Sequence, residues 1–550
     1  EFHGVRVKAE LYQLFPPYLV ENGKAFLAPR INTYVKTKVG LDEIICQITG
    51  EYYDEQNKGQ FTGYFLELTV KGYFDGNNFV QGLRLLPMVA SNIEMLSVNE
   101  FKQINSCNDN NAFVIGTDLY DNSQDYFLSY NKIIPSHIGI FGNTGSGKSN
   151  TLARLMYEYA KIIKGEKNGK LIVFDINNEY GGDSICSREE KIIYQLSTRE
   201  SSSDSRIPLD FKSLDEDEWC VLLNATEATQ RHVIKTAYNE KNDEKKDENY
   251  YKDLISQMIK TGQYQLVRSI QFNMRDYVEG IENLKWHSKS GEFYIIEDYP
   301  NEDYPNKIFA NDNKFQKVFA GIKVTIPKEP LEAFLFHLYF AAAVHIGYGT
   351  QYEFLSPLLR RAEKLFVDFK RVFKDTDDDL FRNKNIVVIQ LANVNQDMTE
   401  LIPSIITDHI FKEQVQKKQK DKICSIVNIV LDEAHNLLYE DETSNRHTKI
   451  TINTFEKAIK EGRKFGLFLW ISSQRPSDIS ETIISQMHNY FIHKLVNPYD
   501  VNRIRKAVAF LDENAMNALT VLGPGECIVA GTGVNMPGFI KVRQVDEKYR

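Results

Sequence analysis

The chain has 550 residues, of which 42% are hydrophobic and 26% are charged. These proportions match an average soluble globular protein and exclude a disordered or fibrous chain, while the length predicts several domains. The formal net charge of -9 excludes a generally basic nucleic-acid coat protein, although it leaves room for a local basic channel.

Cysteine usage and hydropathy predict a cytoplasmic protein. The six cysteines are scattered without a C-x-x-C pair, so neither a zinc site nor a disulfide framework is indicated. No N-terminal signal peptide is visible. The longest apolar stretch, residues 333–348, contains His337 and His345 and is too short for an easy membrane span. We therefore expect it to be a buried helix, and we expect no membrane partner.

The N-terminal part, residues 1–115, contains short β-prone runs separated by Gly, Asn and Asp turns. Such runs occur at residues 25–28, 43–48 and 64–70. Short strands at regular spacing predict a small β-barrel or sandwich. We expect a small N-terminal β-barrel domain.

From residue 116 the pattern changes to alternating strands and helices. Runs that are apolar on both faces are typical of a parallel sheet covered by helices. They occur at residues 138–141, 171–175, 386–391, 426–431 and 467–471. Between residues 215 and 382 such strands are missing and long amphipathic helical stretches replace them. The sequence therefore predicts an α/β domain, residues 116–214 and 383–550, with a helical insertion at 215–382.

The octapeptide at residues 142–149, Gly-Asn-Thr-Gly-Ser-Gly-Lys-Ser, fits the P-loop pattern G-x-x-x-x-G-K-[ST]. Its glycines let backbone N–H groups converge on phosphate oxygens, Lys148 reaches the β- and γ-phosphates, and the Ser149 hydroxyl ligates Mg²⁺. An apolar run precedes the loop and helically spaced apolar residues follow it, as the motif requires. The alternative is a glycine-rich turn with an incidental lysine. We predict that ATP and Mg²⁺ are cofactors, with the nucleotide bound by Gly142, Asn143, Thr144, Gly145, Ser146, Gly147, Lys148, Ser149 and Asn150.

A second acidic motif follows the run at residues 426–431. A P-loop enzyme needs a strand that delivers one carboxylate to the metal and another to the attacking water. Asp432 is placed to hold Mg²⁺ through water, and Glu433 is placed to polarise the attacking water. The alternative is an acidic strand end in a loop.

Two further polar sites flank the run at residues 467–471. If strand order is conventional, Gln474 lies next to the strand that carries Asp432, where its amide could sense the γ-phosphate and orient water. The alternative role for Gln474 is to cap the following helix. Arg463 and Lys464 stand at a helix end, where two cations also interact favourably with the helix dipole.

Together these motifs resemble the HerA-type ATPases, which are hexameric, DNA-translocating relatives of the FtsK class. The resemblance rests on residues 142–149, 175–180, 432–435, 461–466 and 473–479, and it continues at 485–486 and 495–500. It implies an N-terminal β-barrel, a RecA-like core with a parallel sheet, and a helical insertion. It also implies a homo-hexamer with DNA in a central channel.

The resemblance assigns roles to individual residues. It implies that Arg463 is an arginine finger acting on the neighbouring subunit's nucleotide, that Gln474 is a sensor, and that Glu179 is an accessory carboxylate near the γ-phosphate. The family more often has a His-Gly pair before that glutamate, where this chain has Asn177-Asn178. Segments 523–526 and 535–538 resemble a C-terminal segment that reaches an adjacent subunit's nucleotide.

The sequence therefore predicts an ATP-driven DNA translocase or helicase that works with a nuclease or another effector, in bacterial anti-phage defence. An alternative is a nucleotide-binding hexameric scaffold that assembles and gates a partner enzyme with little translocation. A conjugation or secretion ATPase is a third reading, disfavoured because no membrane anchor is visible.

Overall fold

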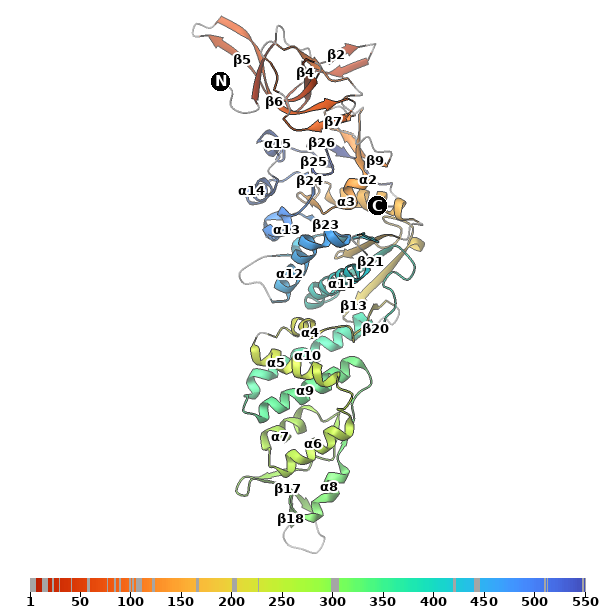
Figure 1. Cartoon of the computed structure of the whole chain (residues 1–550), viewed down its shortest axis with the longest axis vertical. Helices are drawn as coiled ribbons and strands as arrows, with labels where there is room; N and C mark the ends of the chain where they lie inside the picture. The colour runs from red at the N-terminus through yellow and green to blue at the C-terminus, as the bar shows by residue number, and fades with distance from the viewer. Residues whose placement is uncertain are drawn as a thin grey trace. The chain divides into compact units, whose positions relative to one another are not determined.

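The structure is a computed structural model in which the chain forms two compact units, Glu1–Gln195 with Phe381–Arg550, and Leu196–Leu380 (Figure 1). We call them the first and the second unit. The four domain boundaries predicted from the sequence stay predictions. The structure describes residues 6–11, 18–21, 24–28, 30–40, 42–56, 60–76, 78–83, 86–88, 91–97, 100, 103–104, 111–120, 124–164, 168–199, 205–225, 227–297, 306–418, 422–439, 446–508, 511, 513–546 and 549.

The first unit begins with an antiparallel sheet in the order β1-β6-β5-β4-β8, with β7 also paired to β6. The predicted runs at residues 43–48 and 64–70 lie inside its two longest strands. Among the described pairings none closes the sheet, so the barrel stays a prediction. The strands are β1 (Arg6–Leu11), β4 (Tyr34–Val39), β5 (Asp42–Gln56), β6 (Gln60–Asp75), β7 (Asn78–Gln81) and β8 (Ile93–Met95), with a separate hairpin of β2 (Tyr18–Glu21) and β3 (Lys24–Leu27).

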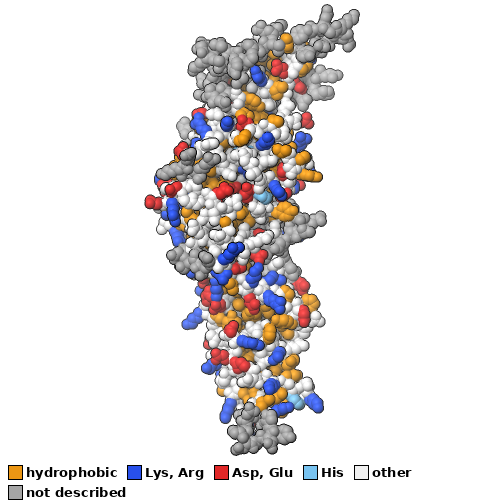
Figure 2. Space-filling view, turned by 180° about the vertical axis from the view of Figure 1, so that it is seen from behind, with side chains coloured by type: hydrophobic (Ala, Val, Ile, Leu, Met, Phe, Trp, Pro, Cys, Tyr) orange, Lys and Arg blue, Asp and Glu red, His pale blue; other side chains and the backbone are white. Residues whose placement is uncertain are grey.

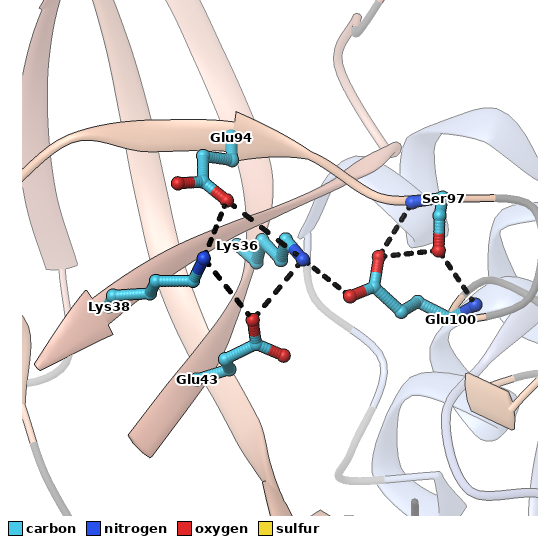
Figure 3. Close-up of polar contacts among 6 residues, drawn as sticks. All are labelled: Lys36, Lys38, Glu43, Glu94, Ser97 and Glu100. Carbon is cyan, nitrogen blue, oxygen red and sulfur yellow. Dashed lines mark hydrogen bonds and ion pairs between the residues drawn. The ribbon is translucent and has the colours of Figure 1, made fainter. Parts of the chain in front are cut away.

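The two faces of this sheet differ because side chains alternate along a strand. Val35 packs in an apolar cluster with residues such as Ile44 and Leu68. The next residue, Lys36, points to the other face, where its ammonium lies 3.3 Å from Glu43 and also pairs with Glu100 (Figure 3). Burial disfavours the charged form of Lys36, but its hydrogen bonds to the two carboxylates outweigh this and raise its pKa.

The centre of the first unit is an 11-stranded sheet in the order β10-β9-β26-β25-β24-β11-β23-β22-β12-β21-β13. Its strands from β24 to β21 pair in parallel, as the runs apolar on both faces predict. The sheet also has an antiparallel part, β24-β25-β26-β9-β10, which the sequence pattern did not show. The strands are β9 (Ala112–Asp118), β10 (Asp125–Ser129), β11 (Ile138–Phe141), β12 (Gly169–Asp175), β13 (Lys191–Ser197), β21 (Ile386–Asn393), β22 (Ile426–Leu431), β23 (Leu467–Ser473), β24 (Asn489–His493), β25 (Glu526–Gly531) and β26 (Gly538–Val542).

Helices pack on this sheet and bury one continuous core. Leu152, Leu155 and Met156, which recur at helical spacing, lie in the same cluster as Ile140 and Trp470 of the sheet. The helices are α2 (Tyr130–Ile133), α3 (Lys148–Ile163), α11 (Gln396–Lys417), α12 (Arg446–Glu461), α13 (Glu481–Ser485), α14 (Pro498–Ala507) and α15 (Glu513–Ala518). The fold class is therefore α/β, and β11, the strand that precedes the predicted P-loop, lies in the middle of a mainly parallel sheet.

The second unit is mainly helical, but its described residues also form three small sheets that the sequence pattern did not show. They are β14 (Ile207–Leu209) with β20 (Phe373–Asp375), β15 (Val278–Glu279) with β19 (Lys323–Val324), and β16 (Lys285–His287), β17 (Glu292–Glu297) and β18 (Asn306–Phe309). The helices are α4 (Glu216–Leu222), α5 (Ala228–Lys241), α6 (Glu248–Lys260), α7 (Tyr264–Asn273), α8 (Gln316–Gly321), α9 (Pro330–Gly347) and α10 (Tyr352–Val372).

Helix α9 forms the core of the second unit. Phe334 stacks on Trp219 with the ring centroids 4.1 Å apart. In the described part of the chain α9 is the one helix long and apolar enough to cross a membrane, and 61% of that segment is buried inside the protein. The predicted buried helix at residues 333–348 is confirmed.

Candidate nucleotide-binding site

The predicted P-loop follows β11, between the ends of two neighbouring strands. Phe141 is in register with Ser473 of β23 on one side and with Ile492 of β24 on the other. The Gly142 N–H donates to the Ser473 carbonyl (3.3 Å), and the Asn143 N–H donates to the Lys494 carbonyl (2.8 Å). The loop is thus fixed at the carboxyl edge of the sheet, where ligands bind in open α/β folds.

Glycine is needed at the end of this loop. Gly147 has a φ of 112°, and a Cβ there would lie 2.8 Å from the Gly525 Cα. Gly145 has a φ of 74°, but a Cβ there would meet nothing within 4 Å. Helix α3 begins directly after Gly147, so its unpaired N-terminal amides border the loop, as an anion-binding site requires.

Lys148 is buried, with 6% of its surface exposed, and its ammonium donates to the Asn143 carbonyl (3.3 Å). Burial lowers the pKa of Lys148, while the charges of Glu433, Asp432 and Glu179 oppose this. The structure thus brings the predicted lysine and the three predicted carboxylates together at one edge of the sheet.

Asp432 and Glu433 follow β22 directly. Both oxygens of the Asp432 carboxylate accept hydrogen bonds, Oδ1 from the Glu433 N–H (2.9 Å) and Oδ2 from the Tyr180 hydroxyl (2.7 Å). Glu433 has a left-handed backbone, with a φ of 49°. Such a conformation in a non-glycine residue is concentrated at functional sites.

The Glu433 carboxylate lies in a mostly buried environment. Its Oε2 makes no hydrogen bond, although His435 Nδ1 is 3.4 Å away. Burial raises the pKa of Glu433, the nearby Asp432 and Glu179 charges add to this, and Lys148 opposes it. A carboxylate with a raised pKa is a stronger base toward water.

Glu179 lies in the loop after β12, and Asp175 shapes that loop. The Asp175 carboxylate, 1% exposed, accepts the N–H groups of Glu179 and Tyr180, each at 2.9 Å. Asn178 has a φ of 61°, a left-handed conformation that glycine and asparagine tolerate best. This explains how Asn178 replaces the glycine that the resembled family more often has before its glutamate.

Gln474 follows β23, which lies between β11 and β22, so it stands next to the strand of Asp432 as expected. The Thr144 hydroxyl of the P-loop donates to the Gln474 Oε1. The preceding Ser473 Oγ lies 3.3 Å from His435 Nδ1. The amide is therefore in contact with the P-loop, where a sensor of the nucleotide would lie.

Arg463 lies elsewhere. It belongs to the 3-10 turn before β23, at the end of that strand opposite to Gln474. Its side chain lines a hollow of about 390 Å³ together with residues that include Lys132, Phe468 and His488. The structure does not bring Arg463 to the P-loop of its own chain.

Sequence reasoning missed His493, which lies against the P-loop glycines Gly142 and Gly147. His493, fully buried at the end of β24, accepts at Nε2 from the Thr151 hydroxyl (2.9 Å) and donates from Nδ1 to the Glu526 carbonyl (2.9 Å). The carbonyl can only accept, which fixes this tautomer. Burial lowers the pKa of His493 to about 4. The available signal was a histidine ending the apolar run 490–492.

The C-terminal segment at residues 523–526 also contacts this site. The Gly525 N–H donates to the Ser146 carbonyl at 2.8 Å, within the same chain. The sequence resemblance implied a contact with an adjacent subunit's nucleotide. In the structure this segment supports the chain's own P-loop.

The residues present fit a phosphate group and Mg²⁺. Two buried oxygens at this edge of the sheet, Ser146 Oγ in the P-loop and Glu433 Oε2 after β22, have no hydrogen-bond partner within the protein. Ser149 is exposed at the start of α3, and Asp432 supplies a carboxylate. In the described ranges no group of three or more His, Cys, Asp or Glu side chains gathers as a metal cage. A magnesium ion that uses one or two protein ligands and substrate phosphates needs none.

Two family models match the chain. "Helicase HerA, central domain" matches residues 113–319, and "Helicase HerA-like C-terminal" matches residues 410–543. The two regions together cover more than half of the chain and contain the P-loop, Asp432, Glu433 and Gln474.

Curated relatives include proteins that carry the HerA name. The "DNA double-strand break repair helicase HerA" of Pyrococcus furiosus is 23% identical over 80% of this chain and 70% of its own length. The protein of that name from Sulfurisphaera tokodaii is 35% identical over 31% of this chain and 34% of its own length. A protein of Methanocaldococcus jannaschii described as a probable helicase is 22% identical over 77% of this chain. The chain spans 65% of the length of that relative.

Two solved structures are similar in outline. VirB4 of Thermoanaerobacter pseudethanolicus aligns with a TM-score of 0.46 and 14% identity, over 80% of this chain and 99% of its own. The bacterial conjugative coupling protein TrwBdeltaN70 aligns with a TM-score of 0.44 and 10% identity, over 83% of this chain and 93% of its own. With the two family models matched, the chain belongs to the HerA-type ATPases of the HerA/FtsK superfamily.

Proposed function

We propose that this protein is a ring-shaped, ATP-driven DNA translocase of the helicase type. The observation that carries the proposal is the convergence of Lys148, Asp432 and Glu433 at the P-loop edge, with Gln474 held by the loop itself. Relatives named as DNA double-strand break repair helicases support DNA as the substrate.

Each residue at the edge has a chemical role in the proposed hydrolysis. The loop amides and Lys148 hold the phosphates of ATP, and Ser149 and Asp432 would hold Mg²⁺, which neutralises phosphate charge when bound. Glu433 takes a proton from the attacking water, and its raised pKa favours this. Gln474, which accepts a hydrogen bond from the Thr144 hydroxyl of the P-loop, senses the γ-phosphate. Glu179 is an accessory carboxylate near the same phosphate.

The position of Arg463 favours a ring. Because this arginine lies at the opposite end of β23 from its own site, it can assist hydrolysis only on another subunit's nucleotide. Arginine fingers supplied in trans stabilise the charge of the transition state and make hydrolysis depend on the neighbour. We therefore propose a homo-hexamer with ATP at the subunit interfaces and DNA in the central channel.

The DNA-contacting surface is proposed to face that channel. On the face drawn in Figure 2, basic and acidic side chains are interspersed, with no continuous basic patch over the described residues. Lys and Arg gathered around a narrow channel can reverse the local potential despite the acidic total. The proposed partner is a nuclease or other effector, and the proposed setting is anti-phage defence in the bacterial cytoplasm.

ATP turnover measured with and without duplex DNA tests this function. Lys148→Ala should abolish tight ATP binding, whereas Glu433→Gln should retain binding and lose turnover. Lys161→Ala, a change at an exposed lysine of the same helix, is the matched control and should keep both. DNA affinity should fall with salt, with a slope of log K against log[salt] of about -0.9 per neutralised phosphate.

Two results would contradict this proposal. Near wild-type turnover by Glu433→Gln would show that Glu433 is not the base. Absence of DNA stimulation at low salt, combined with tight and salt-insensitive binding of an effector protein, would favour the alternative of a scaffold that gates a partner.

A further inference from the structure

The hydroxyl of Tyr180 makes a buried hydrogen bond to the carboxylate of Asp432. The donor and Asp432 Oδ2 are 2.7 Å apart, and the two residues are 252 positions apart in the chain. Tyr180 is 4% exposed and Asp432 is 6% exposed. Because the other oxygen, Oδ1, accepts the Glu433 N–H, both ends of the carboxylate are fixed and it cannot rotate freely.

Both backbone polar groups of Tyr180, the N–H and the carbonyl, are hydrogen-bonded to buried side chains. Its N–H donates to the Asp175 carboxylate (2.9 Å), and its carbonyl accepts from the Lys191 ammonium (2.9 Å). Lys191 is 3% exposed and also bonds the Ser184 carbonyl. The backbone of Tyr180 is therefore fixed between the end of β12 and the start of β13, and from there the buried phenol reaches the end of β22.

We infer that Tyr180 is a positioning residue that aims the Asp432 carboxylate at Mg²⁺. This inference rests on the proposed function, in which Asp432 holds the metal. A carboxylate oxygen has more than one lone pair, so Oδ2 can accept the Tyr180 proton and still face a metal-bound water. Hydrogen bonds from such outer partners orient metal ligands, and their loss typically costs about 10- to 100-fold in metal affinity.

The bond also joins two parts of the site. Glu179 directly precedes Tyr180, so the loop that presents this accessory carboxylate is tethered to the metal carboxylate on another strand. A change that moves the Tyr180 phenol therefore moves Asp432 relative to Ser149, and the metal position follows.

The test is the Mg²⁺ dependence of binding of a fluorescent ATP analogue to the full chain. Tyr180→Phe should raise the half-saturating Mg²⁺ concentration by about 10-fold or more. Its affinity for the analogue in EDTA should stay as in the wild type, which also reports that the variant is folded. In an Asp432→Ala background, Tyr180→Phe should add no further shift.

Tyr490→Phe is the matched control. Tyr490 is a buried tyrosine of the same sheet whose hydroxyl donates to a backbone carbonyl, that of Ile484, at 2.8 Å. This variant should lose stability as Tyr180→Phe does and leave the Mg²⁺ dependence unchanged. If both variants keep the wild-type Mg²⁺ dependence, the positioning role is wrong. If the wild type itself binds no nucleotide, the proposed function fails instead.

Discussion

His493 and Thr151 meet under the phosphate-binding loop, with His493 Nε2 2.9 Å from the Thr151 Oγ1. Removing the imidazole takes the hydrogen-bond partner from the buried Thr151 hydroxyl and takes one partner from the Glu526 carbonyl. We expect His493→Ala to lower the free energy of unfolding by about 3 kcal/mol and to weaken ATP binding. Thr151→Val removes one of the two bonds and should cost about 1 kcal/mol. Chemical denaturation measures both, and equal losses would contradict the two-bond role.

The pH dependence of stability should reveal the same histidine. Burial lowers the pKa of His493 from 6.5 to about 4 in the folded chain. Between pH 6.5 and pH 4 the histidine is therefore protonated in the unfolded chain but neutral in the folded chain. The contribution of His493 to the free energy of unfolding is complete above pH 6.5 and is lost as the pH falls toward 4. The loss is about 3 kcal/mol. His493→Gln should remove this part of the acid sensitivity, measured as the difference between the two denaturation curves.

Two glycines of the loop should respond differently to alanine. Gly147→Ala places a Cβ 2.8 Å from the Gly525 Cα in a backbone with a φ of 112°, so the loop must shift. We expect ATP affinity to fall about 100-fold. The Cβ of Gly145→Ala would meet no atom within 4 Å, so only the strain of a φ of 74° remains. The ATP affinity of this variant should therefore fall by about 10-fold at most. Calorimetric titration with ATP and Mg²⁺ compares them, and equal losses would show that strain alone decides.

Arg463→Ala should leave ring assembly and ATP affinity largely intact and reduce turnover by about 10³-fold or more. Lys464→Ala, at the next exposed position of the same turn, is the control and should stay active. Mixing Arg463→Ala subunits with Lys148→Ala subunits should restore some turnover, because an intact P-loop can then meet an intact arginine. No recovery under verified subunit exchange would favour a role of Arg463 at the helix end.

Lys36 should matter more than its neighbour Lys38. Lys36→Met leaves Glu43, Glu94 and Glu100 around a half-buried site without their central cation, and we expect a loss of about 2 kcal/mol. The Lys38 side chain is 52% exposed, and Lys38→Met should cost about 0.5 kcal/mol or less. Thermal unfolding followed by circular dichroism distinguishes the two, and similar shifts would mean that the buried position of Lys36 has no effect.

The Glu100 carboxyl gives this cluster a pH signature. Burial alone would raise its pKa, but hydrogen bonds from Lys36 and Ser97 lower it below the ordinary 4.5. Its stabilisation is therefore present above pH 4.5 and is lost as the pH falls through the lowered value. Lys36→Met should show a smaller loss in acid than the wild type, whereas Lys38→Met should behave as the wild type does.

The position of Lys148, Asp432 and Gln474 at one edge of the sheet was predictable from local sequence. Lys148, Asp432 and Gln474 each follow an apolar run, and the carboxyl ends of parallel strands share one edge of a sheet. The contact of Tyr180 with Asp432 was not predictable, since nothing in either segment specifies a partner 252 residues away. Periodicity gives the faces of a strand but not its neighbours, and this is why the antiparallel strands β25 and β26 were missed.

The second unit shows a different limit. Its strands, such as β15 and β19, contain as few as two residues, which is too short for an alternating pattern to appear. Its long helix α9 was predictable, because a continuous apolar run of that length that still contains histidines suits a helix buried in the core of a protein. The asparagine at position 178, where the resembled family more often has glycine, was explained only by its left-handed backbone, with a φ of 61°.

The arrangement of the central sheet has a consequence for how the chain is made. Ser136, just before β11, bonds to Asn489 at the start of β24, 353 residues later. A ribosome takes roughly 20 to 70 s to add that many residues. For most of that interval the P-loop strand β11 has been synthesised but lacks both of its neighbours, β23 and β24, and its apolar faces need protection from aggregation. A nascent chain therefore completes the strands on both sides of β11, and with them the edge that presents the P-loop, only after residue 493 has been added.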